Sequence, residues 1–582
     1  MTSSITDKLS SLNQEDRLSR RQLIKGATAA MGIGAARVLL PDQAFSSSTA
    51  EHFPTTPASI SDTVAASDSS PIANTSAGRV RGYTRKGIYT FKGIPYGDTT
   101  AGENRFMPPK EPKPWMGIRS SMHFGYVCPQ PPRSLSAGDE TEWLFEHDGG
   151  IQGEDCLAIN IWTPGLGSQK KRPVMVWLHG GGYYAGSSQE LQANDGENLS
   201  QRGDVVVASL NHRLGSLGHL DLSRYGEKYR NSGNVGMLDI VAALRWVKEN
   251  IANFGGDPGL VTIFGQSGGG GKVATLMAMP SAQGLFHRAI IESGSMMRAF
   301  PQEQSTQLAE ALVKKLGLDA STVDKLQQVP IEKLEAATTA VETKIPNLRS
   351  GFRDARIRGS SHPWAPVIDG QVLPEQPFDQ HAPAISANVH MLVGTTLNEF
   401  VTAINHPEHS KMSRRELLTN VEEIHGEKAS LVIETFQKAF PNASPFEIFS
   451  VIANAPMRFD ALRQANLKAA QGAAPAYCYW FWWQPPVLNG RPMAFHCSEM
   501  SFAFFNSDRC ENMTGGGPAA RALAEKVSDA WIQFARTGDP NHAGLPQWSP
   551  VTSGTNATMV FDNECFFRNN LDDEQQQFTR GS

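Results

Sequence analysis

Long hydrophobic runs, runs of like charge and clustered cysteines are all scarce in this sequence. Beyond the N-terminal segment, no apolar stretch reaches the ~18 residues that a membrane-spanning helix needs, which predicts a soluble body. Lysine and arginine (53) nearly balance aspartate and glutamate (58) without a basic stripe, and this argues against nucleic acid as a partner. The 6 cysteines form no C-x-x-C pair and no Cys/His cluster with zinc-ligand spacing, so the spacing indicates no metal site.

The N-terminal segment carries a twin-arginine signature. Arg20 and Arg21 lie in the stretch S-R-R-Q-L-I-K, and a mildly apolar run of small residues follows at 26–36. A basic amphipathic arm is the alternative, but the arginine pair, Lys25 and the weakly apolar run occur together in the order of a signal. We predict a signal peptide over residues 1–45 that the twin-arginine export machinery recognises, and therefore a periplasmic or secreted bacterial protein.

The remainder of the chain is predicted to form one domain. Cleavage of the signal is expected between Ala44 and Ala50, where small residues fit several bonds. Residues 46–73, rich in Ser, Thr, Ala and Pro, are predicted to be a disordered lead-in. The strands and helices beyond them alternate without a linker-like break, so we predict a single large domain over residues 74–575.

The pattern of this domain is that of an α/β protein with a mostly parallel central sheet. Nearly continuous apolar runs are typical of strands that helices bury on both faces, and they occur at 173–178, 205–210, 289–291, 389–393 and 477–483. Alternating segments at 79–83, 88–91 and 157–162 are predicted to be antiparallel edge strands. Helical spacing is found at 238–251, at 518–536 and, with more polar residues, from 304 to about 358, where a cap over the pocket is expected.

A strand, a sharp turn and a helix are predicted around Ser267. An apolar run at 260–264 leads into the G-x-S-x-G motif of residues 265–269, and a helical segment follows at 273–278. Small neighbours at Gly265 and Gly269 permit the strained backbone that exposes the serine hydroxyl above the sheet. A flexible glycine loop is the alternative, but the flanking strand and helix favour a nucleophile for acyl transfer, since backbone N–H groups at the helix start can bind an oxyanion.

A second glycine motif follows the 173–178 strand. His179 begins the sequence H-G-G-G, the type of loop that supplies oxyanion N–H groups in lipases and esterases. An ordinary glycine turn would look similar. The position favours the functional interpretation, because the glycines follow a core strand and precede Ser267 in the order that the fold requires.

These motifs resemble those of the type B carboxylesterase and cholinesterase family of α/β-hydrolases. Further similar stretches lie at 91–96, 236–239, 257–258, 293–294 and 537–540, so the resemblance covers almost all of the chain beyond about residue 74. It implies the α/β-hydrolase fold with helical cap insertions. It also implies oxyanion donors at Gly181, Gly182 and Gly268, a supporting serine at Ser293 and a disulfide between Cys128 and Cys156.

The chain departs from the family pattern near the nucleophile and the histidine. The family usually has Glu and Ala where this chain has Gln266 and Gly268, and Gly where it has Cys497. Gly268 is expected to loosen the oxyanion donor that it supplies, and Cys497 to stiffen its loop. A pairing of Cys497 with Cys510 stays open, whereas Cys478 is expected to pack as a small hydrophobic residue in a buried strand.

The acid and the histidine follow Ser267 in the chain order of α/β-hydrolases. Glu399 comes just past the 389–393 strand, at the sheet edge where catalytic groups gather. Asp369 is the second candidate, although an Asp-Gly turn explains it. His496 follows the last aromatic strand and matches the family motif; the later histidines set aside in its favour are His406, His409, His425 and His542.

We therefore interpret Ser267 as the nucleophile, His496 as the general base and then acid, and Glu399 as the group that stabilises the imidazolium. The predicted function is hydrolysis of a small-molecule carboxylic ester through an acyl-enzyme, without a cofactor. A catalytically silent, cholinesterase-like binding protein is one alternative, and the complete Ser-Glu-His set argues against it. Transacylation, lactone cleavage or amide cleavage by the same residues stays open.

Overall fold

The computed structural model describes residues 63–131, 138–167, 170–342 and 363–578. The predicted signal peptide lies outside the described residues. Strand β1 (Ile72–Thr75) begins inside the lead-in that was predicted to be disordered. The backbones of Ala65 and Thr84 exchange two hydrogen bonds of 2.8 Å, so the chain from Ala65 onward contacts the folded body.

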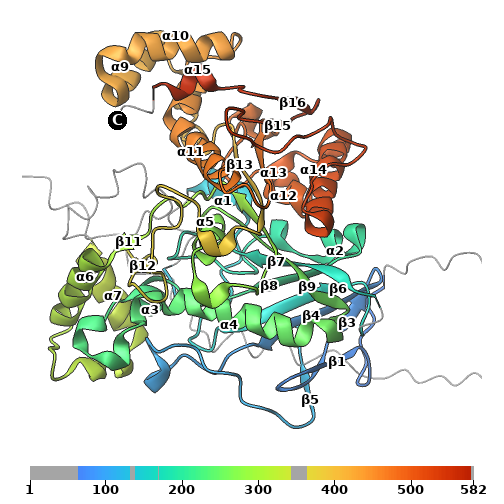
Figure 1. The fold of residues 1–582 in the computed structure, drawn as a ribbon, viewed down its shortest axis with the longest axis vertical. Coiled ribbons are helices and arrows are strands. Elements are labelled where there is room, and N and C mark those ends of the chain that lie inside the picture. The colour runs from blue at the N-terminus through green and yellow to red at the C-terminus, as the bar shows by residue number, and fades with distance from the viewer. Residues whose placement is uncertain (1–62, 132–137, 168–169, 343–362, 579–582) are drawn as a thin grey trace, which may run out of the picture. The chain divides into compact units, whose positions relative to one another are not determined.

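An eleven-stranded sheet forms the centre of the fold, in the order β16-β15-β14-β13-β10-β9-β7-β8-β6-β4-β3 (Figure 1). All neighbours from β15 to β8 are parallel, whereas β6, β4 and β3 at one side and β16 at the other pair antiparallel. The predicted mostly parallel sheet is therefore confirmed. The strands are β3 (Tyr83–Arg85), β4 (Ile88–Pro95), β6 (Ala158–Thr163), β7 (Arg172–Leu178), β8 (Val206–Leu210), β9 (Gly256–Gln266), β10 (Arg288–Glu292), β13 (His390–Thr396), β14 (Ala476–Phe481), β15 (Thr558–Phe561) and β16 (Phe566–Arg568).

None of the three predicted edge strands lies at an edge of the central sheet: β4 pairs with β6 on one side and with β3 on the other. Strand β6 is interior, since β4 and β8 pair with it on either side and all six of its residues are buried. The polar residue Asn160 gives this strand an alternating pattern although it does not face solvent. Its side chain is 2 % exposed and bonds to the Gly93 N–H and the Ser209 hydroxyl inside the protein. Strand β2 (Gly78–Arg81) belongs to a separate small sheet with β1 and β5 (Ile118–Ser120).

Helices cover both faces of the central sheet, and alternate side chains of one strand enter different hydrophobic clusters. From β7, Val174 and Val176 join the cluster that contains α4 (Val235–Asn250) and α5 (Gly268–Leu276). Met175 and Trp177 join the opposite cluster with α14 (Gly517–Thr537). Burial on both faces explains why the core strands are almost continuously apolar in sequence.

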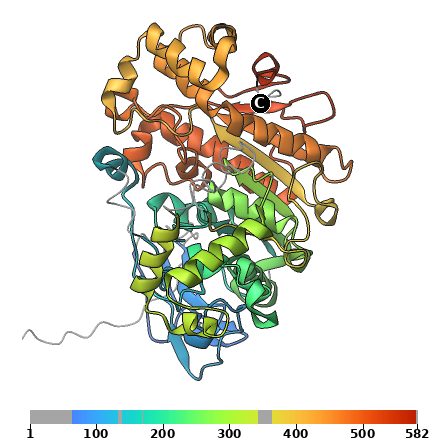
Figure 2. The same cartoon turned by 90° about the vertical axis from the view of Figure 1, so that its left-hand side faces the viewer.

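Two helical insertions interrupt this core, and they lie well apart in both views (Figure 1, Figure 2). The first consists of α6 (Gln302–Lys315) and α7 (Ile331–Glu342), within the predicted cap, whose remainder is outside the described residues. The second separates β13 from β14 and was not predicted. It comprises α9 (Arg414–His425), α10 (Ala429–Ala439) and α11 (Pro445–Ala469), and capping boxes begin α9 and α11.

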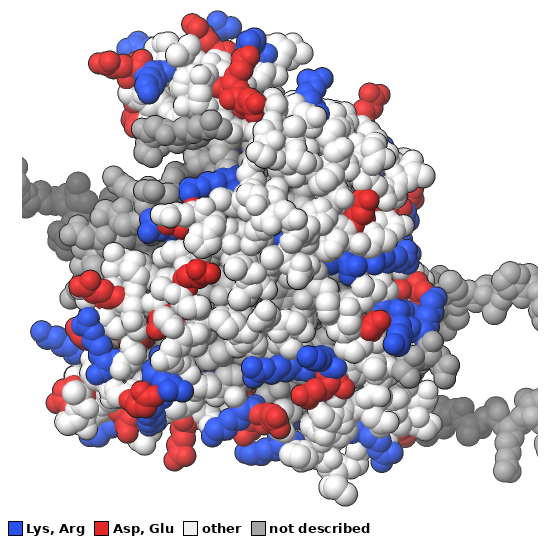
Figure 3. All heavy atoms as spheres, in the orientation of Figure 1, with Lys and Arg blue, Asp and Glu red and all other residues white. Residues whose placement is uncertain are grey.

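Short elements complete the fold: α1 (Asp139–Phe145), α2 (Glu197–Gly203), α3 (Gly215–His219), α12 (Met500–Ala503), α13 (Glu511–Thr514), α15 (Asp573–Gln576), and the parallel pair β11 (Phe300–Pro301) and β12 (Val367–Ile368). On the face drawn in Figure 3, acidic and basic side chains are interspersed among uncharged ones. No helix in the part of the chain that the structure describes is both long and apolar enough to cross a membrane.

Candidate active site

Ser267 alone connects β9 to α5, with φ of 58° and ψ of −124°. A positive φ strains any residue other than glycine, and two main-chain hydrogen bonds hold it here. The Ser267 N–H donates to the Glu292 carbonyl at 2.7 Å, and the Ser267 carbonyl accepts the Gly271 N–H at 3.0 Å. A Cβ on Gly269 would lie 2.0 Å from the Leu178 carbonyl oxygen, so only glycine fits there. The predicted strand, turn and helix are thus observed.

The H-G-G-G loop packs directly against this turn. Gly181 and Gly182 have φ of 84° and 63°, and in the described part of the chain their N–H groups donate to no protein acceptor. The N–H of Gly268 lies in the first turn of α5, where helical N–H groups lack intrahelical partners. A Cβ on Gly268 would lie 2.2 Å from the Gly182 oxygen and 2.4 Å from its nitrogen. The chain needs glycine at 268 because the loop occupies that space.

His496 and Glu399 are joined by their side chains and by their backbones. Nδ1 of His496 lies 2.5 Å from Oε2 of Glu399, and the His496 N–H donates to the Glu399 carbonyl at 2.8 Å. The other carboxylate oxygen of Glu399 accepts the Thr396 N–H at 2.9 Å. Glu399 is 1 % exposed and has a φ of 46°, so a strained turn at the end of β13 presents its carboxylate to the imidazole.

The other contacts of the imidazole come from Gln266 and Phe400. The Gln266 carboxamide nitrogen lies 3.4 Å from both ring nitrogens of His496, and its oxygen accepts the Cys497 thiol at 3.0 Å. Phe400, 61 % exposed, lies on the ring with centroids 4.4 Å apart. Among the described residues no hydrogen bond links the Ser267 hydroxyl to His496. Such bonds are often long without substrate and tighten when it binds.

Two buried carboxyl groups near the predicted triad were not predicted from the sequence. Glu499 accepts the Ser293 hydroxyl at 3.2 Å, so Ser293 bonds to this carboxyl and not to a residue of the predicted triad. Burial first, and then repulsion from Glu399 and Glu292, raises the pKa of Glu499 well above its usual range. Burial raises the pKa of Glu292 to about 7, although the Trp531 indole N–H donates to it at 2.7 Å. Their positions one residue before Ser293 and three after His496 were the available signal.

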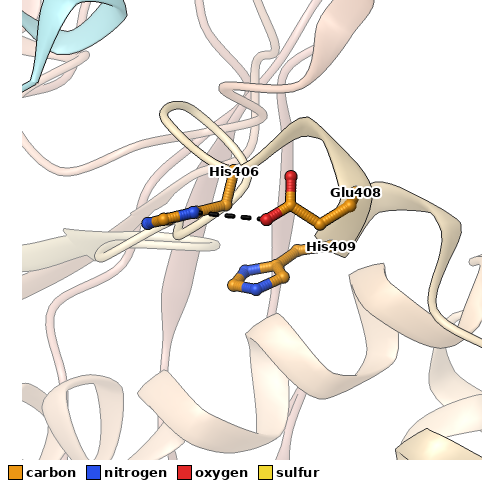
Figure 4. A group of neighbouring side chains, drawn as sticks. All are labelled: His406, Glu408 and His409. Atoms are coloured by element: carbon orange, nitrogen blue, oxygen red, sulfur yellow. Dashed lines mark ion pairs between the residues drawn. The ribbon is translucent and has the colours of Figure 1, made fainter. Parts of the chain in front are cut away.

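The other candidates for the triad lie in ordinary structural settings. The Asp369 Oδ1 atom accepts the N–H groups of Gln371, Val372 and Leu373 at 2.8–3.0 Å, as expected of the turn. Glu408 and His409 lie in a 3₁₀-helix (Pro407–Lys411) with no buried residues, and His406 immediately precedes it (Figure 4).

The structure contains no disulfide among its six cysteines, all of which lie in the described residues. The predicted partners Cys128 and Cys156 are both buried, and interaction with the Cys128 thiol first, and then burial, raises the pKa of the Cys156 thiol well above its usual range. Their disulfide is not formed in the structure and stays a prediction, and no disulfide joins Cys497 to Cys510. Cys478 packs fully buried in β14, as predicted.

Comparison with known proteins gives one consistent answer. Residues 69–579 match the Carboxylesterase family. Para-nitrobenzyl esterase of Bacillus subtilis (strain 168) is 34% identical over 87% of this chain and 98% of its own length; phenmedipham hydrolase of Pseudarthrobacter oxydans is 33% identical over 85% and 95%. Among solved structures, an esterase from Clostridium hathewayi that can hydrolyse aliphatic aromatic polyesters aligns with a TM-score of 0.76 at 36% identity, over 89% of this chain and 99% of the other.

Proposed function

Because this chain belongs to the carboxylesterase family and is a serine carboxylic-ester hydrolase with the α/β-hydrolase fold, we propose that Ser267, His496 and Glu399 form its catalytic triad. His496 takes the proton from the Ser267 hydroxyl as its oxygen bonds to the ester carbonyl carbon. The resulting imidazolium then protonates the departing alcohol. Water, deprotonated by the same imidazole, attacks the acyl-enzyme and releases the acid, so neither a cofactor nor a metal enters the cycle.

We assign the N–H groups of Gly181, Gly182 and Gly268 as the donors that stabilise the negative charge developing on the carbonyl oxygen. The support for this assignment is that the first two have no hydrogen-bond acceptor among the described residues and that the Gly182 backbone packs on Gly268. Donors that are already oriented stabilise the tetrahedral oxygen without reorganisation, and each such donor is typically worth 10²–10³ in kcat.

The single observation that supports the triad most strongly is the 2.5 Å contact between His496 Nδ1 and the buried Glu399 carboxylate, since it orients the imidazole as a general base. The test is rapid-mixing hydrolysis of a para-nitrophenyl ester. The protein should release a burst of about one nitrophenol per chain before steady turnover. Ser267→Ala should stay folded and lose the burst, and a burst that survives this change would refute the assignment.

For the substrate, we propose esters of aryl or benzyl alcohols. Two observations support this class: the name of the relative para-nitrobenzyl esterase, and the exposed Phe400 ring beside His496. A panel of aryl, benzyl, bulky-alkyl and polycarboxylate esters, lactones and amides decides the matter. Phe400→Ala should raise KM for aryl esters more than for alkyl esters, and equal changes would contradict a stacking role.

We propose further that the twin-arginine segment exports the folded enzyme to the periplasm or the medium. Replacement of Arg20 and Arg21 by lysine should retain active enzyme in the cytoplasm, because the receptor of this route reads the arginine pair. Fractionation followed by an esterase assay is the measurement, and unchanged export of the lysine variant would refute the signal.

The same comparison tests a Cys128–Cys156 disulfide, which we propose forms after export. The electrostatic interaction between the two buried thiols supports it, and closing the intervening loop would stabilise the fold by about 3–4 kcal/mol in the chain-entropy model. Differential alkylation with mass spectrometry should find both thiols blocked in exported enzyme and free in retained enzyme, since the cytoplasm is reducing. Free thiols in exported, active enzyme would refute the disulfide.

A further inference from the structure

Two residues at which this chain departs from the family pattern contact each other beside the imidazole. We propose that Cys497 is a positioning residue: its thiol holds the Gln266 carboxamide against His496, and the carboxamide keeps the ring in its catalytic orientation. The proposal rests on the assigned role of His496. It concerns a contact between residues 231 positions apart in the chain, where the family usually has an acid and a glycine.

The backbone at Cys497 indicates that a side chain is held there against strain. Its φ is 78°, in the left-handed region that glycine enters freely and a cysteine does not. Strained residues persist where surrounding contacts fix them, and they gather at functional sites. The contact in question is the 3.0 Å hydrogen bond from the thiol to the Gln266 carboxamide oxygen.

The carboxamide depends on that thiol. Gln266 is 1 % exposed, and among the described residues Cys497 is the hydrogen-bond donor to its side-chain oxygen. Removal of the thiol leaves a buried acceptor unsatisfied, so the carboxamide turns toward another partner. Because its nitrogen lies 3.4 Å from both ring nitrogens, the imidazole then loses the contact on this side and samples orientations in which Glu399 alone restrains it.

The test compares kcat, KM and melting temperature for Cys497→Ala, Cys497→Gly and Cys497→Ser. Alanine should lower kcat about five- to tenfold with KM within about twofold, because the bond matters for ring orientation and not for binding. Serine, which can donate the same bond, should restore most of kcat. Glycine should raise the melting temperature and still lower kcat, which a merely structural role does not predict. Cys565→Ser, a change to another half-buried thiol, is the matched control.

A double-mutant cycle combines Cys497→Ala with Gln266→Leu. In the Gln266→Leu background, Cys497→Ala should lower kcat little further. The proposal is overturned if Cys497→Ala and Cys497→Gly leave kcat within twofold of the unmodified enzyme, or if Cys497→Ser restores no more of kcat than Cys497→Ala. It is also overturned if the kcat losses of Cys497→Ala and Gln266→Leu multiply in the double variant. Each of these outcomes leaves the Ser267 burst intact, so they are distinct from a failure of the triad assignment.

A different observation concerns His406, Glu408 and His409, which the sequence spacing did not indicate as ligands. One nitrogen or oxygen from each lies within 4.8 Å of the others, and His406 Nδ1 is 3.3 Å from Glu408 Oε1 (Figure 4). Two imidazoles and a carboxylate are the ligand types that zinc takes, with the fourth position left to water. We propose that this group binds one divalent transition-metal ion such as zinc.

Thr402 contacts the ring of His409 and the backbone of His406. Its hydroxyl lies 2.9 Å from Nδ1 of His409, which leaves Nε2 of that ring for a metal, and its carbonyl accepts the His406 N–H at 3.2 Å. The rings of His406 and His409 are stacked with centroids 5.0 Å apart, and the His406 and Glu408 side chains are 60 % and 69 % exposed, so a metal ion has access from solvent.

Calorimetric titration of the untagged full-length protein with ZnCl₂ tests this site. One equivalent should bind, and His409→Ala or Thr402→Val should weaken binding about tenfold or more, since loss of a ligand or of its orienting partner typically costs 10–100-fold. His381→Ala, at an exposed histidine that pairs with Glu375, should leave binding unchanged. Absence of saturable binding, or binding that is insensitive to His409→Ala, overturns the site.

Discussion

Replacement of Glu292 by glutamine should remove a loss of stability that the protein suffers as pH rises. Glu292 is fully buried at the end of β10, and burial raises its pKa to about 7 from an ordinary value of 4.5. The folded protein therefore holds this proton more tightly than the unfolded chain does. The resulting stabilisation is complete below about pH 4.5 and is lost as pH rises through about 7. At 1.36 kcal/mol per pKa unit the loss is roughly 3 kcal/mol.

Glutamine isolates this effect, because it stays uncharged and keeps an oxygen for the Trp531 indole N–H. Melting temperatures of the two proteins, compared at pH 5 and pH 8 at one scan rate and ionic strength, should agree at pH 5 and favour Glu292→Gln by several degrees at pH 8. Glu427→Gln, at an exposed carboxylate, should show no such difference. A gap that is the same at both pH values, or a variant that is less stable at pH 8, would refute the reasoning.

Further predictions concern the acid and the oxyanion loop. Glu399→Gln should lower kcat about 10⁴-fold, because an amide does not stabilise the imidazolium, while Asp369→Asn should stay within a few-fold; steady-state kinetics that rank them the other way would reassign the triad. Gly268→Ala should lower kcat about 10²–10³-fold, since its Cβ would lie 2.2 Å from the Gly182 oxygen and displace an oxyanion donor. Gly149→Ala, where a Cβ meets nothing within 4 Å, is its control, and equal activity of the two variants would contradict the packing argument.

The sequence predicted best those features whose residues lie close together along the chain. The turn at Ser267 was predicted because the apolar run, the glycines and the following helix lie within about twenty consecutive residues. Glu399 was selected because parallel strands bring their carboxyl ends to one edge of the sheet. In both cases a short pattern sufficed.

The packing of individual polar side chains against distant segments was not predicted. Residues 157–162 were predicted to form an edge strand, whereas three distant segments satisfy the polar Asn160 in the interior. Glu292 and Glu499 lie close in sequence to Ser293 and His496, but the burial that raises their pKa values depends on distant segments of the chain. The close approach of the Gly182 backbone, which leaves no room for a Cβ at Gly268, was likewise not visible in the sequence, and the expected loosening of the Gly268 donor stays a prediction.

The assignment of Ser267 as the nucleophile is tested most directly by covalent labelling. The purified enzyme is treated with a fluorophosphonate probe, digested and sequenced by mass spectrometry, with Ser267→Ala treated in parallel. The account predicts one phosphonylated residue, Ser267, loss of esterase activity in step with labelling, and no label on the alanine variant, because the Ser267 hydroxyl lies at the strained turn against which the H-G-G-G loop packs. Label on another serine, or full activity after complete labelling of Ser267, would contradict it.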